Sequence, residues 1–364
     1  MTGDPVSSGR FDEWHREDWR KPVEDGPVEF AVVGLGGFAR EYALPAFAAA
    51  TNCETTVAVS SSPEKAESVA DEFDMARAIT YDEYHDGVAA EDYDAVYVVT
   101  PHALHEPYVE TAARLGKAVL CEKAMAATRD GAERIAKTVD EAGIPFMVAY
   151  RMQFGPAVRR ARELVDSGFI GDPVHIHGSF SFRMLDDPSQ PDESWRLDKG
   201  LSGGGALTDI GLYPLNTTRF VLDSEPVSVA AMTASPDAAF ADVDEHVSFQ
   251  FAFENGVQAQ CNASFNAYEG HQLRITGTEG RITLDPVFVE GNEQTVTLER
   301  DGMTETVELG AVDQLPPQFD YFAQCVLRGE EPIAGAAEGV RDMELVEAIY
   351  EAADEERVVD VALS

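Results

Sequence analysis

The sequence predicts an α/β Rossmann domain with a doubly wound parallel sheet, followed by an α+β domain with a large, mostly antiparallel, open-faced sheet. From residue 28 onward, short β-rich runs alternate with helical stretches, the pattern of parallel strands joined by crossover helices. After Tyr150, strands follow one another through tight turns such as Glu254–Gly256 and Thr278–Gly280. A length of 364 residues with 44% hydrophobic content is enough for two cores. We therefore expect an N-terminal arm at 1–27, the Rossmann domain at 28–149, and a substrate-binding and oligomerisation domain at 150–364.

In the first domain we expect five strands with helices between them. The strands are predicted at Phe30–Gly34, Thr55–Ser60, Ala95–Thr100, Ala118–Glu122 and Pro145–Ala149, and the helices begin near Ala39, Pro63, His105 and Arg129.

In the second domain, strands are predicted at Val174–Arg183, Val227–Thr233, Glu245–Phe253, Val257–Asn266, Gln272–Gly277 and Arg281–Leu284, and helices at Pro156–Asp166, 206–222, 316–329 and 336–354. The helix at 206–222 should cover one face of the sheet, so the opposite face is either solvated or buried between subunits.

The composition is strongly acidic, with 66 Asp+Glu against 27 Lys+Arg and a net charge of −39. Such a surface repels nucleic acid and anionic membranes, so we expect neither as a partner. Acid-rich, lysine-poor chains are typical of halophiles that accumulate salt; an ordinary acidic protein is the alternative. The four cysteines lie far apart without a paired motif, and no secretory signal or membrane span is seen. These features favour a cytoplasmic protein with reduced thiols.

A dinucleotide site is predicted at Gly34-x-Gly36-x-x-Ala39, because a strand precedes this motif and a helix follows it. The turn residues Gly34, Leu35, Gly36, Gly37 and Phe38 should lie against the pyrophosphate. A glycine-rich helix cap without a ligand is the alternative interpretation.

The end of the second strand indicates which dinucleotide is bound. Ser60 and Ser61 stand where an acid would bind the ribose of NAD, and Lys65 follows. Small hydroxyls and a lysine favour the 2′-phosphate of NADP. The alternative is a solvated helix N-terminus with an incidental lysine.

Thr100, Pro101 and His105 follow the third major strand, at the sheet edge where ligands bind in such folds. We expect them near the cofactor, although a proline and a capping threonine also make an ordinary turn from strand to helix.

Lys123 is one of only six lysines, and it ends an apolar run that starts at Ala118. A cation at this edge can orient a hydroxyl, stabilise an alkoxide, or relay a proton if burial lowers its pKa. Alternatively, it pairs with Glu122 or caps a helix.

A triple glycine at 203–205 leads into a predicted helix that carries Asp209 and Tyr213. Four residues apart, these two side chains share one helix face. A carboxylate and a phenol there can bind a polyol and move its proton.

Several ordered motifs now resemble the Gfo/Idh/MocA oxidoreductase family over about residues 28–364. They are the GxGxxA turn, Thr100-Pro101 with His105, Glu122-Lys123, Tyr150-Arg151, the run from Gly203 to Tyr213, and Ala348-Ile-Tyr-Glu-Ala. The tyrosine at 213, the Ser60–Lys65 spacing and Trp195-Arg196 are similar to the glucose-fructose oxidoreductase and dihydrodiol dehydrogenase branch, which uses NADP. Ala124 departs from the family pattern, which has proline after the lysine, so we expect a different turn after Lys123.

The resemblance implies NADP-dependent oxidation of an aldopyranose, D-xylose first among candidates, at C1 to the aldonolactone. It assigns catalysis and sugar binding to Lys123, Asp209 and Tyr213, and adds Glu122, Lys123, Arg151, Trp195 and Arg196 to the cofactor site. Tyr213 would take the hydroxyl proton, helped by a nearby lysine because an isolated phenol has a pKa of about 10. Other aldose or inositol dehydrogenases, a glucose-fructose oxidoreductase, and a non-catalytic NADP-bound sugar sensor remain open.

The family commonly pairs through the open sheet, which implies a homodimer or homotetramer. No metal site is predicted, because His175 and His177 alternate along one strand without a carboxylate partner.

Overall fold

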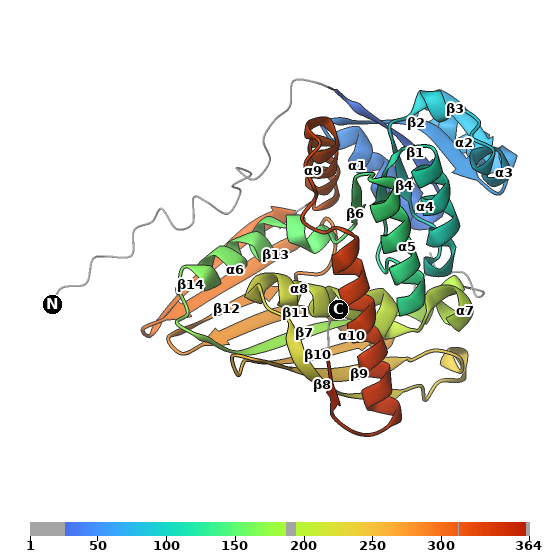
Figure 1. Ribbon diagram of the computed structural model, residues 1–364. Helices are drawn as coiled ribbons and strands as arrows, with labels where there is room; N and C mark the ends of the chain where they lie inside the picture. Colours follow the sequence, from blue (N-terminus) through green and yellow to red (C-terminus); the bar gives the residue numbers. More distant parts are fainter. Residues whose placement is uncertain (1–25, 187–193, 312, 362–364) are drawn as a thin grey trace.

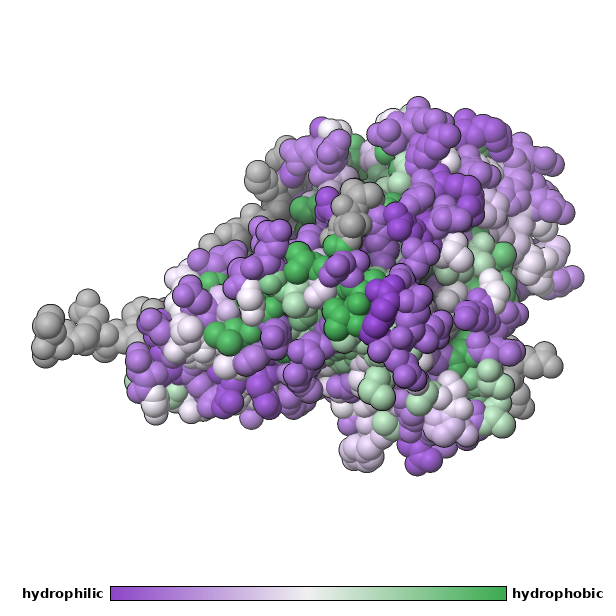
Figure 2. All heavy atoms as spheres, turned by 60° about the horizontal axis from the view of Figure 1, so that its bottom comes forward, coloured by the Kyte–Doolittle hydropathy of each residue, from purple (hydrophilic) through white to green (hydrophobic). Residues whose placement is uncertain are grey.

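The computed structural model describes residues 26–186, 194–311 and 313–361, and it contains two sheets (Figure 1). The predicted arm at 1–27 lies outside the described residues, apart from its last two. In the described ranges no helix is both long and apolar enough to cross a membrane. On the face that Figure 2 shows, hydrophilic residues predominate and hydrophobic ones form smaller groups between them.

The first sheet is parallel throughout, in the order β3-β2-β1-β4-β5-β6, which confirms the predicted Rossmann fold. Its strands are β1 (Val28–Val33), β2 (Cys53–Ser60), β3 (Arg77–Thr80), β4 (Ala95–Val98), β5 (Ala118–Cys121) and β6 (Phe146–Val148). Strands β2 and β3 are added on one side of β1, and β4 to β6 on the other side. In such a sheet the ligand crevice lies at the carboxyl ends of β1 and β4, where the strand order switches. The edge strand β3 was not predicted, because only Ile79 of its four residues is buried.

The helices of this domain are α1 (Leu44–Ala49), α2 (Pro63–Glu72), α3 (Tyr81–His85), α4 (His105–Arg114) and α5 (Arg129–Ala142). The helix expected from Ala39 begins as a π-helical turn, Ala39–Ala43. Hydroxyl caps fix three of the helix starts: Ser62 accepts from Lys65 N, Thr80 forms a capping box with Glu83, and Thr128 accepts from Gly131 N.

The second sheet has the order β14-β13-β12-β11-β7-β10-β9-β8-β15, and only β7 and β10 pair in parallel. This confirms the mostly antiparallel prediction. The strands are β7 (Pro173–Arg183), β8 (Pro226–Ala234), β9 (His246–Phe253), β10 (Gln258–Ser264), β11 (Asn266–Gly277), β12 (Gly280–Asp285), β13 (Glu293–Arg300), β14 (Met303–Ala311) and β15 (Val359–Asp360).

Helices cover one face of this sheet (Figure 1). They are α6 (Pro156–Asp166), α8 (Leu212–Leu222), which continues a π-helical turn at Leu207–Gly211, and α10 (Ala336–Asp354). The short helix α7 (Lys199–Ser202) instead packs against the loop His102–Leu104 of the first domain. The contact between α8 and β7 is close, because a Cβ at Gly178 would lie 2.6 Å from Pro214 Cβ.

On the five strands from β11 to β8 the opposite face of the sheet is polar and lacks acids, whereas the same rows reach Glu299 and Glu308 on β13 and β14 and Asp360 on β15. Side chains alternating with buried Ile176 and Phe180 on β7 point to this open face, and strand register extends them into three rows. The rows are Thr276–His175–Gln258–Ala252–Ser228, Arg274–His177–Gln260–Gln250–Ala230 and Gln272–Ser179–Asn262–Ser248–Met232. None of these fifteen positions is an aspartate or glutamate, in a chain with 66 acids.

Helix α9 (Leu315–Arg328) returns from the second sheet to the first domain. The Phe319 ring stacks on Phe47 with centroids 3.9 Å apart and meets the edge of Tyr97 at 5.4 Å. The Asp320 carboxylate accepts hydrogen bonds of 2.7 Å from the backbone N–H of Thr51 and of Asn52. A segment more than 260 residues away along the chain therefore completes the packing around β1 and α1.

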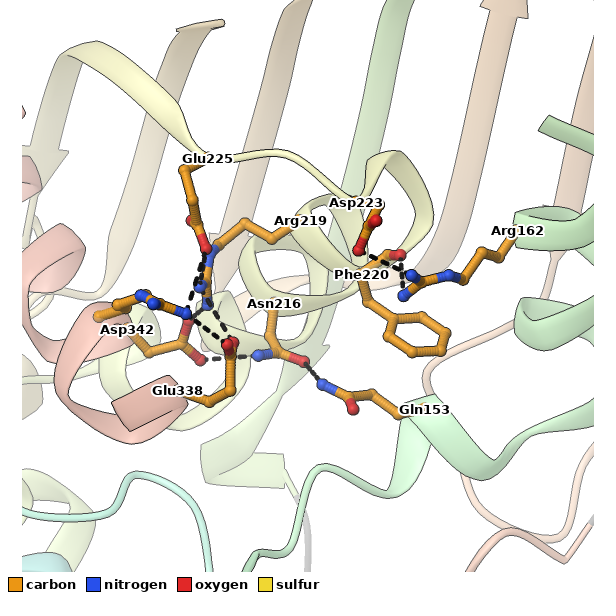
Figure 3. A network of polar contacts seen from close by, with 10 residues as sticks. Gln153, Arg162, Asn216, Arg219, Phe220, Asp223, Glu225, Glu338 and Asp342 are labelled. Carbon is orange, nitrogen blue, oxygen red and sulfur yellow. Dashed lines mark hydrogen bonds and ion pairs between the residues drawn. The ribbon is translucent and has the colours of Figure 1, made fainter. Parts of the chain in front are cut away.

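A polar network fastens α8 to α10 (Figure 3). The buried Arg219 guanidinium pairs with Glu225, Glu338 and Asp342, while Asn216 links Asp342 to Gln153. A hollow of about 800 Å³ adjoins this network. The arginines that line it at 162, 219 and 341 each have a carboxylate partner, so the network holds the helices together.

Candidate active site

The glycine-rich turn follows β1 and leaves room for a ligand. Gly34 has φ +102°, and a Cβ there would lie 2.8 Å from Val99 O, so the turn requires glycine against the end of β4. Nothing lies within 4 Å of a Cβ built on Gly36. Leu35 is buried below the turn, and Phe38 stacks on Tyr42. The backbone at Gly36 and Gly37 thus offers the open cradle that a pyrophosphate needs.

The end of β2 matches the predicted 2′-phosphate site only in part. Ser61 and Lys65 are exposed at the start of α2, whereas Ser60 is buried and its hydroxyl accepts from Ser62 N at 3.3 Å. Ser62, which we did not select from the sequence, caps the helix and donates to Glu64 at 2.9 Å. Ser61 and Lys65 therefore remain the candidates for phosphate contact, and Ser60 supports the turn.

The loop after β4 contains Thr100 and His105, both of which were predicted to lie near the cofactor. Thr100 is buried, and its Oγ1 has no hydrogen-bond partner among the described residues, which leaves a donor for a ligand. His105 is wholly buried, with Nε2 2.8 Å from Thr100 O and Nδ1 3.1 Å from Met125 O. Our expectation that His105 contacts the cofactor is wrong, because its ring lies beneath the loop and braces it.

His102 in the same loop was missed by the sequence analysis. Its Nδ1 lies 2.8 Å from Ser202 O, and its ring meets the edge of Trp195 at 4.8 Å. Burial, together with the Lys123 charge, lowers the pKa of His102 to about 3. The ring is thus neutral, with Nδ1–H donating to the carbonyl. The sequence Thr-Pro-His after β4 could have indicated that His102 lies near the site, but it did not reveal the contact with Ser202.

Lys123 and Asp209 meet across the domain boundary. Lys123 Nζ donates to Asp209 O at 2.6 Å and to Asp209 Oδ1 at 2.9 Å. Burial alone would lower the pKa of Lys123, but the Asp209 carboxylate outweighs it and the pKa is raised. Without nucleotide, Lys123 is therefore expected to be protonated, which disfavours the alternative in which it relays a proton through a lowered pKa.

Arg196 holds the other oxygen of the Asp209 carboxylate, with Nε 2.8 Å from Oδ2. Burial would raise the pKa of Asp209, but Arg196 and Lys123 hold it well below its usual range. The contact with Asp209 was not predicted for Arg196, which we expected at the cofactor. Its guanidinium also lies 4.7 Å from the Trp195 ring, so both residues wall the site beside His102.

Tyr213 lies on the same face as Asp209, as predicted, and two cations flank its ring. Lys123 Nζ is 5.0 Å from the ring centroid and Arg151 Cζ is 4.7 Å from it. Arg151 Nε also donates to Tyr213 Oη at 3.2 Å. The rings of Phe180 and Phe288 pack around the phenol at 5.3 and 6.2 Å. The site is a half-buried cluster in which a phenol, an ammonium and a carboxylate converge.

Glu122 lies below this group. Its Oε1 accepts from Tyr97 Oη at 2.7 Å and its Oε2 from Lys123 N at 3.2 Å. Burial raises the pKa of Glu122. The peptide bond from Lys123 to Ala124 is cis, and Ala124 is buried.

Asp244 anchors the glycine loop that leads to Asp209, and it too was missed. Its carboxylate accepts from Gly205 N at 2.6 Å, Leu207 N at 2.8 Å and Tyr350 Oη at 2.6 Å. Cβ atoms at Gly203, Gly204 and Gly205 would collide with Ala127, Tyr350 and Asp244. The three glycines are therefore required for the close approach of this loop.

Among residues 26–186, 194–311 and 313–361, no group of three or more His, Cys, Asp or Glu could hold a metal ion.

Two family models match the chain. Residues 28–150 match an oxidoreductase family with an NAD-binding Rossmann fold, and residues 158–283 match the GFO/IDH/MocA C-terminal domain.

Named relatives cover nearly the whole chain. A D-xylose 1-dehydrogenase [NADP(+)] of Haloarcula marismortui is 47% identical over 97% of this chain and 98% of its own length. D-xylose 1-dehydrogenase (NADP(+)) 2 of Haloferax volcanii is 30% identical over 91% of this chain and 99% of its own.

Two solved structures share the fold. An aldose-aldose oxidoreductase from Caulobacter crescentus, complexed with glycerol, superposes with a TM-score of 0.86 at 32% identity, covering 92% of this chain and 99% of that one. A 3-ketoreductase from Actinomadura kijaniata in complex with NADP and TDP-benzene gives 0.79 at 28% identity, covering 90% and 98%.

Proposed function

The chain belongs to the Gfo/Idh/MocA family of oxidoreductases, and on that basis we propose that it oxidises D-xylose at C1 to the aldonolactone with NADP. The observation that carries this is the convergence of Lys123, Asp209 and Tyr213 at the sheet edge that bears the glycine-rich turn. The 47% identity with a D-xylose 1-dehydrogenase over 97% of the chain supports the same substrate and cofactor.

The residues at the β1–β4 crevice fit a dinucleotide. The open backbone at Gly36 and Gly37 would hold the pyrophosphate, and Thr100 Oγ1 supplies an unpaired donor beside it. Ser61 and Lys65, with no acid at positions 60–62, favour a 2′-phosphate. When bound there, NADP would supply the acceptor for the hydride that leaves C1.

The side chains of the site divide the remaining work. Lys123 is protonated, so it holds a sugar hydroxyl and stabilises negative charge on oxygen. Asp209 is ionised and accepts hydrogen bonds from sugar hydroxyls. Tyr213, as the phenolate, accepts the proton of the C1 hydroxyl as the C1–H pair leaves as hydride, and the resulting phenol releases that proton to solvent. The products are the lactone and NADPH.

The test is reduction of NADP and of NAD in molar KCl with D-xylose, D-glucose, L-arabinose and myo-inositol. The highest kcat/KM with xylose and NADP is expected. Equal use of NAD would contradict the roles of Ser61 and Lys65, and tight binding of NADP and sugar without turnover would indicate a sugar sensor.

A second candidate reaction is dismutation between two aldoses with the nucleotide retained. The 32% identity and TM-score of 0.86 with an aldose-aldose oxidoreductase favour it. Protein that keeps a stoichiometric nucleotide through purification and needs no added NADP would support this reaction over the dehydrogenase.

We also propose that the open sheet face is buried between subunits of a homodimer or homotetramer. Between β11 and β8 its three rows carry no acid, although the net charge is −39 and acids appear in the same rows on the outer strands. A surface kept in contact with concentrated salt solution would be expected to share the acidic composition of the rest of the chain. The acid excess supports a halophilic protein, and four free cysteines at 53, 121, 261 and 325 support a reducing, cytoplasmic location.

A further inference from the structure

Arg151 was expected at the cofactor, but its guanidinium is directed at Tyr213. Its Nε donates to Tyr213 Oη at 3.2 Å, and its Cζ lies 4.7 Å from the centre of the phenol ring. Lys123 Nζ lies 5.0 Å from the same centre. Two cations thus face one phenol, whose ring also packs against Phe180 and Phe288.

Other segments fix the guanidinium in this position. Its NH1 donates to Glu290 Oε2 at 3.2 Å and to Gln314 Oε1, and its NH2 donates to Phe288 O at 2.6 Å. Glu290 is itself held by the backbone N–H of Gln314 at 2.6 Å. Arg151 is 7% exposed, so little water screens its charge. The guanidinium is therefore preorganised toward the phenol oxygen.

The charged and titratable groups around Tyr213 come from several elements. Lys123 and Glu122 follow β5, Tyr97 lies on β4, and Asp209 precedes Tyr213 on its own helix. Glu290 and His271 face Arg151 from the second sheet and its loops. Asp209 is already paired with Lys123 and Arg196. Glu290 is thus the carboxylate that directly offsets Arg151.

We propose that Arg151 is a positioning residue for the Tyr213 base: it orients the phenol and, with Lys123, stabilises the phenolate. This inference rests on the proposed function for its consequence in catalysis. The guanidinium keeps all its protons while the C1-hydroxyl proton moves to Tyr213 Oη. Glu290 has the opposite influence on the phenolate: its negative charge reduces the stabilisation that Arg151 provides.

The test is an ultraviolet titration of phenol ionisation in the protein without sugar or nucleotide. A Tyr213→Phe variant run in parallel isolates Tyr213 from the other tyrosines. Removing a cation at this distance in Arg151→Gln should raise the ionisation midpoint by about one pH unit or more. Arg151→Lys, which keeps the charge, should restore much of this shift. Glu290→Gln should move the midpoint downward.

Arg219→Gln is the matched control, because Arg219 is also a buried, carboxylate-paired arginine but lies in the network of Figure 3. It should leave the Tyr213 midpoint unchanged even where it lowers stability. If Arg151 had only a structural role, the Tyr213 midpoint would not be expected to move in opposite directions in Arg151→Gln and Glu290→Gln. An unchanged midpoint in both variants would overturn the proposal. If Arg151→Gln does not fold, the Glu290→Gln and Arg151→Lys titrations decide.

NADP affinity, measured by fluorescence quenching, separates the proposal from direct cofactor contact. Arg151→Gln should bind NADP within about twofold of the parent while its kcat at neutral pH falls at least about tenfold. Weaker NADP binding with an unchanged phenol titration would overturn the inference. Because the titration uses no substrate, a protein that oxidises no sugar can still confirm or refute it.

Discussion

Replacing Lys123 with alanine removes the cation that touches both Asp209 and Tyr213. Lys123 Nζ lies 5.0 Å from the Tyr213 ring centre, and its side chain is only 12% exposed. If the phenolate charge is placed at the ring centre and the effective dielectric constant is about 20, a unit charge at this distance stabilises the phenolate by about 3 kcal/mol. A loss of that size corresponds to a fall of about 100-fold in kcat. The Kd for NADP should change little, since the lost charge acts on the reacting oxygen.

The assay is initial-rate NADPH formation from D-xylose in molar KCl, with NADP affinity measured separately. Lys117→Ala is the matched control, because Lys117 begins the same strand region and lies 5.2 Å from the Tyr93 ring. It donates to Tyr93 O and touches no residue of the candidate site. Turnover of Lys123→Ala within a few-fold of the parent would refute the mechanism. A fall shared equally by both variants would mean that general destabilisation, and not the site, is responsible.

Three further outcomes are expected. In Ser61→Asp, the new carboxylate should repel a 2′-phosphate, so the ratio of kcat/KM with NADP to kcat/KM with NAD should fall at least about tenfold. An unchanged ratio would mean that the 2′-phosphate binds elsewhere. Burial lowers the pKa of His102 from 6.5 to about 3, so the unfolded chain binds a proton below about pH 6.5 that the folded protein does not. The contribution of His102 to the free energy of unfolding is therefore constant above pH 6.5 and falls by about 1.4 kcal/mol per pH unit below it. In urea unfolding, His102→Gln should make the free energy of unfolding depend less steeply on pH in this range. An equal pH dependence in the variant and the parent would contradict a neutral buried ring. Gln260→Glu on the open face should dissociate the oligomer in low salt, as measured by light scattering. Thr138→Glu on α5 adds the same charge away from that face and should leave the oligomer intact. If neither variant dissociates, the open face is not the interface.

The sequence was sufficient for the order and type of most elements, because their hydrophobic periods are strong. Helices α6 and α10 have the predicted bounds. Strands β13 and β14 were not predicted, since they lie toward an edge of the sheet and alternate charged or hydroxyl residues with few buried ones, such as Val296 and Leu298. Edge strands with one exposed face give a weak hydrophobic signal.

Prediction of the site depended on sequence separation. Lys123, Asp209 and Tyr213 were found because each lies in a recognisable local pattern. The partners of Arg151 could not be found in this way, because Gln314 is 163 residues away and Glu290 is 139. His102 and Asp244 likewise act through backbone groups of distant loops, and no local spacing encodes such contacts.

The return of α9 to the first domain has a consequence for how the protein is made. During synthesis, the first domain leaves the ribosome long before residues 315–328 are made. The surface of Phe47 that Phe319 later covers is therefore exposed to water until α9 emerges. Such distant contacts also slow folding. We therefore expect a product truncated before α9 to leave this apolar patch uncovered and to accumulate less than the full-length protein.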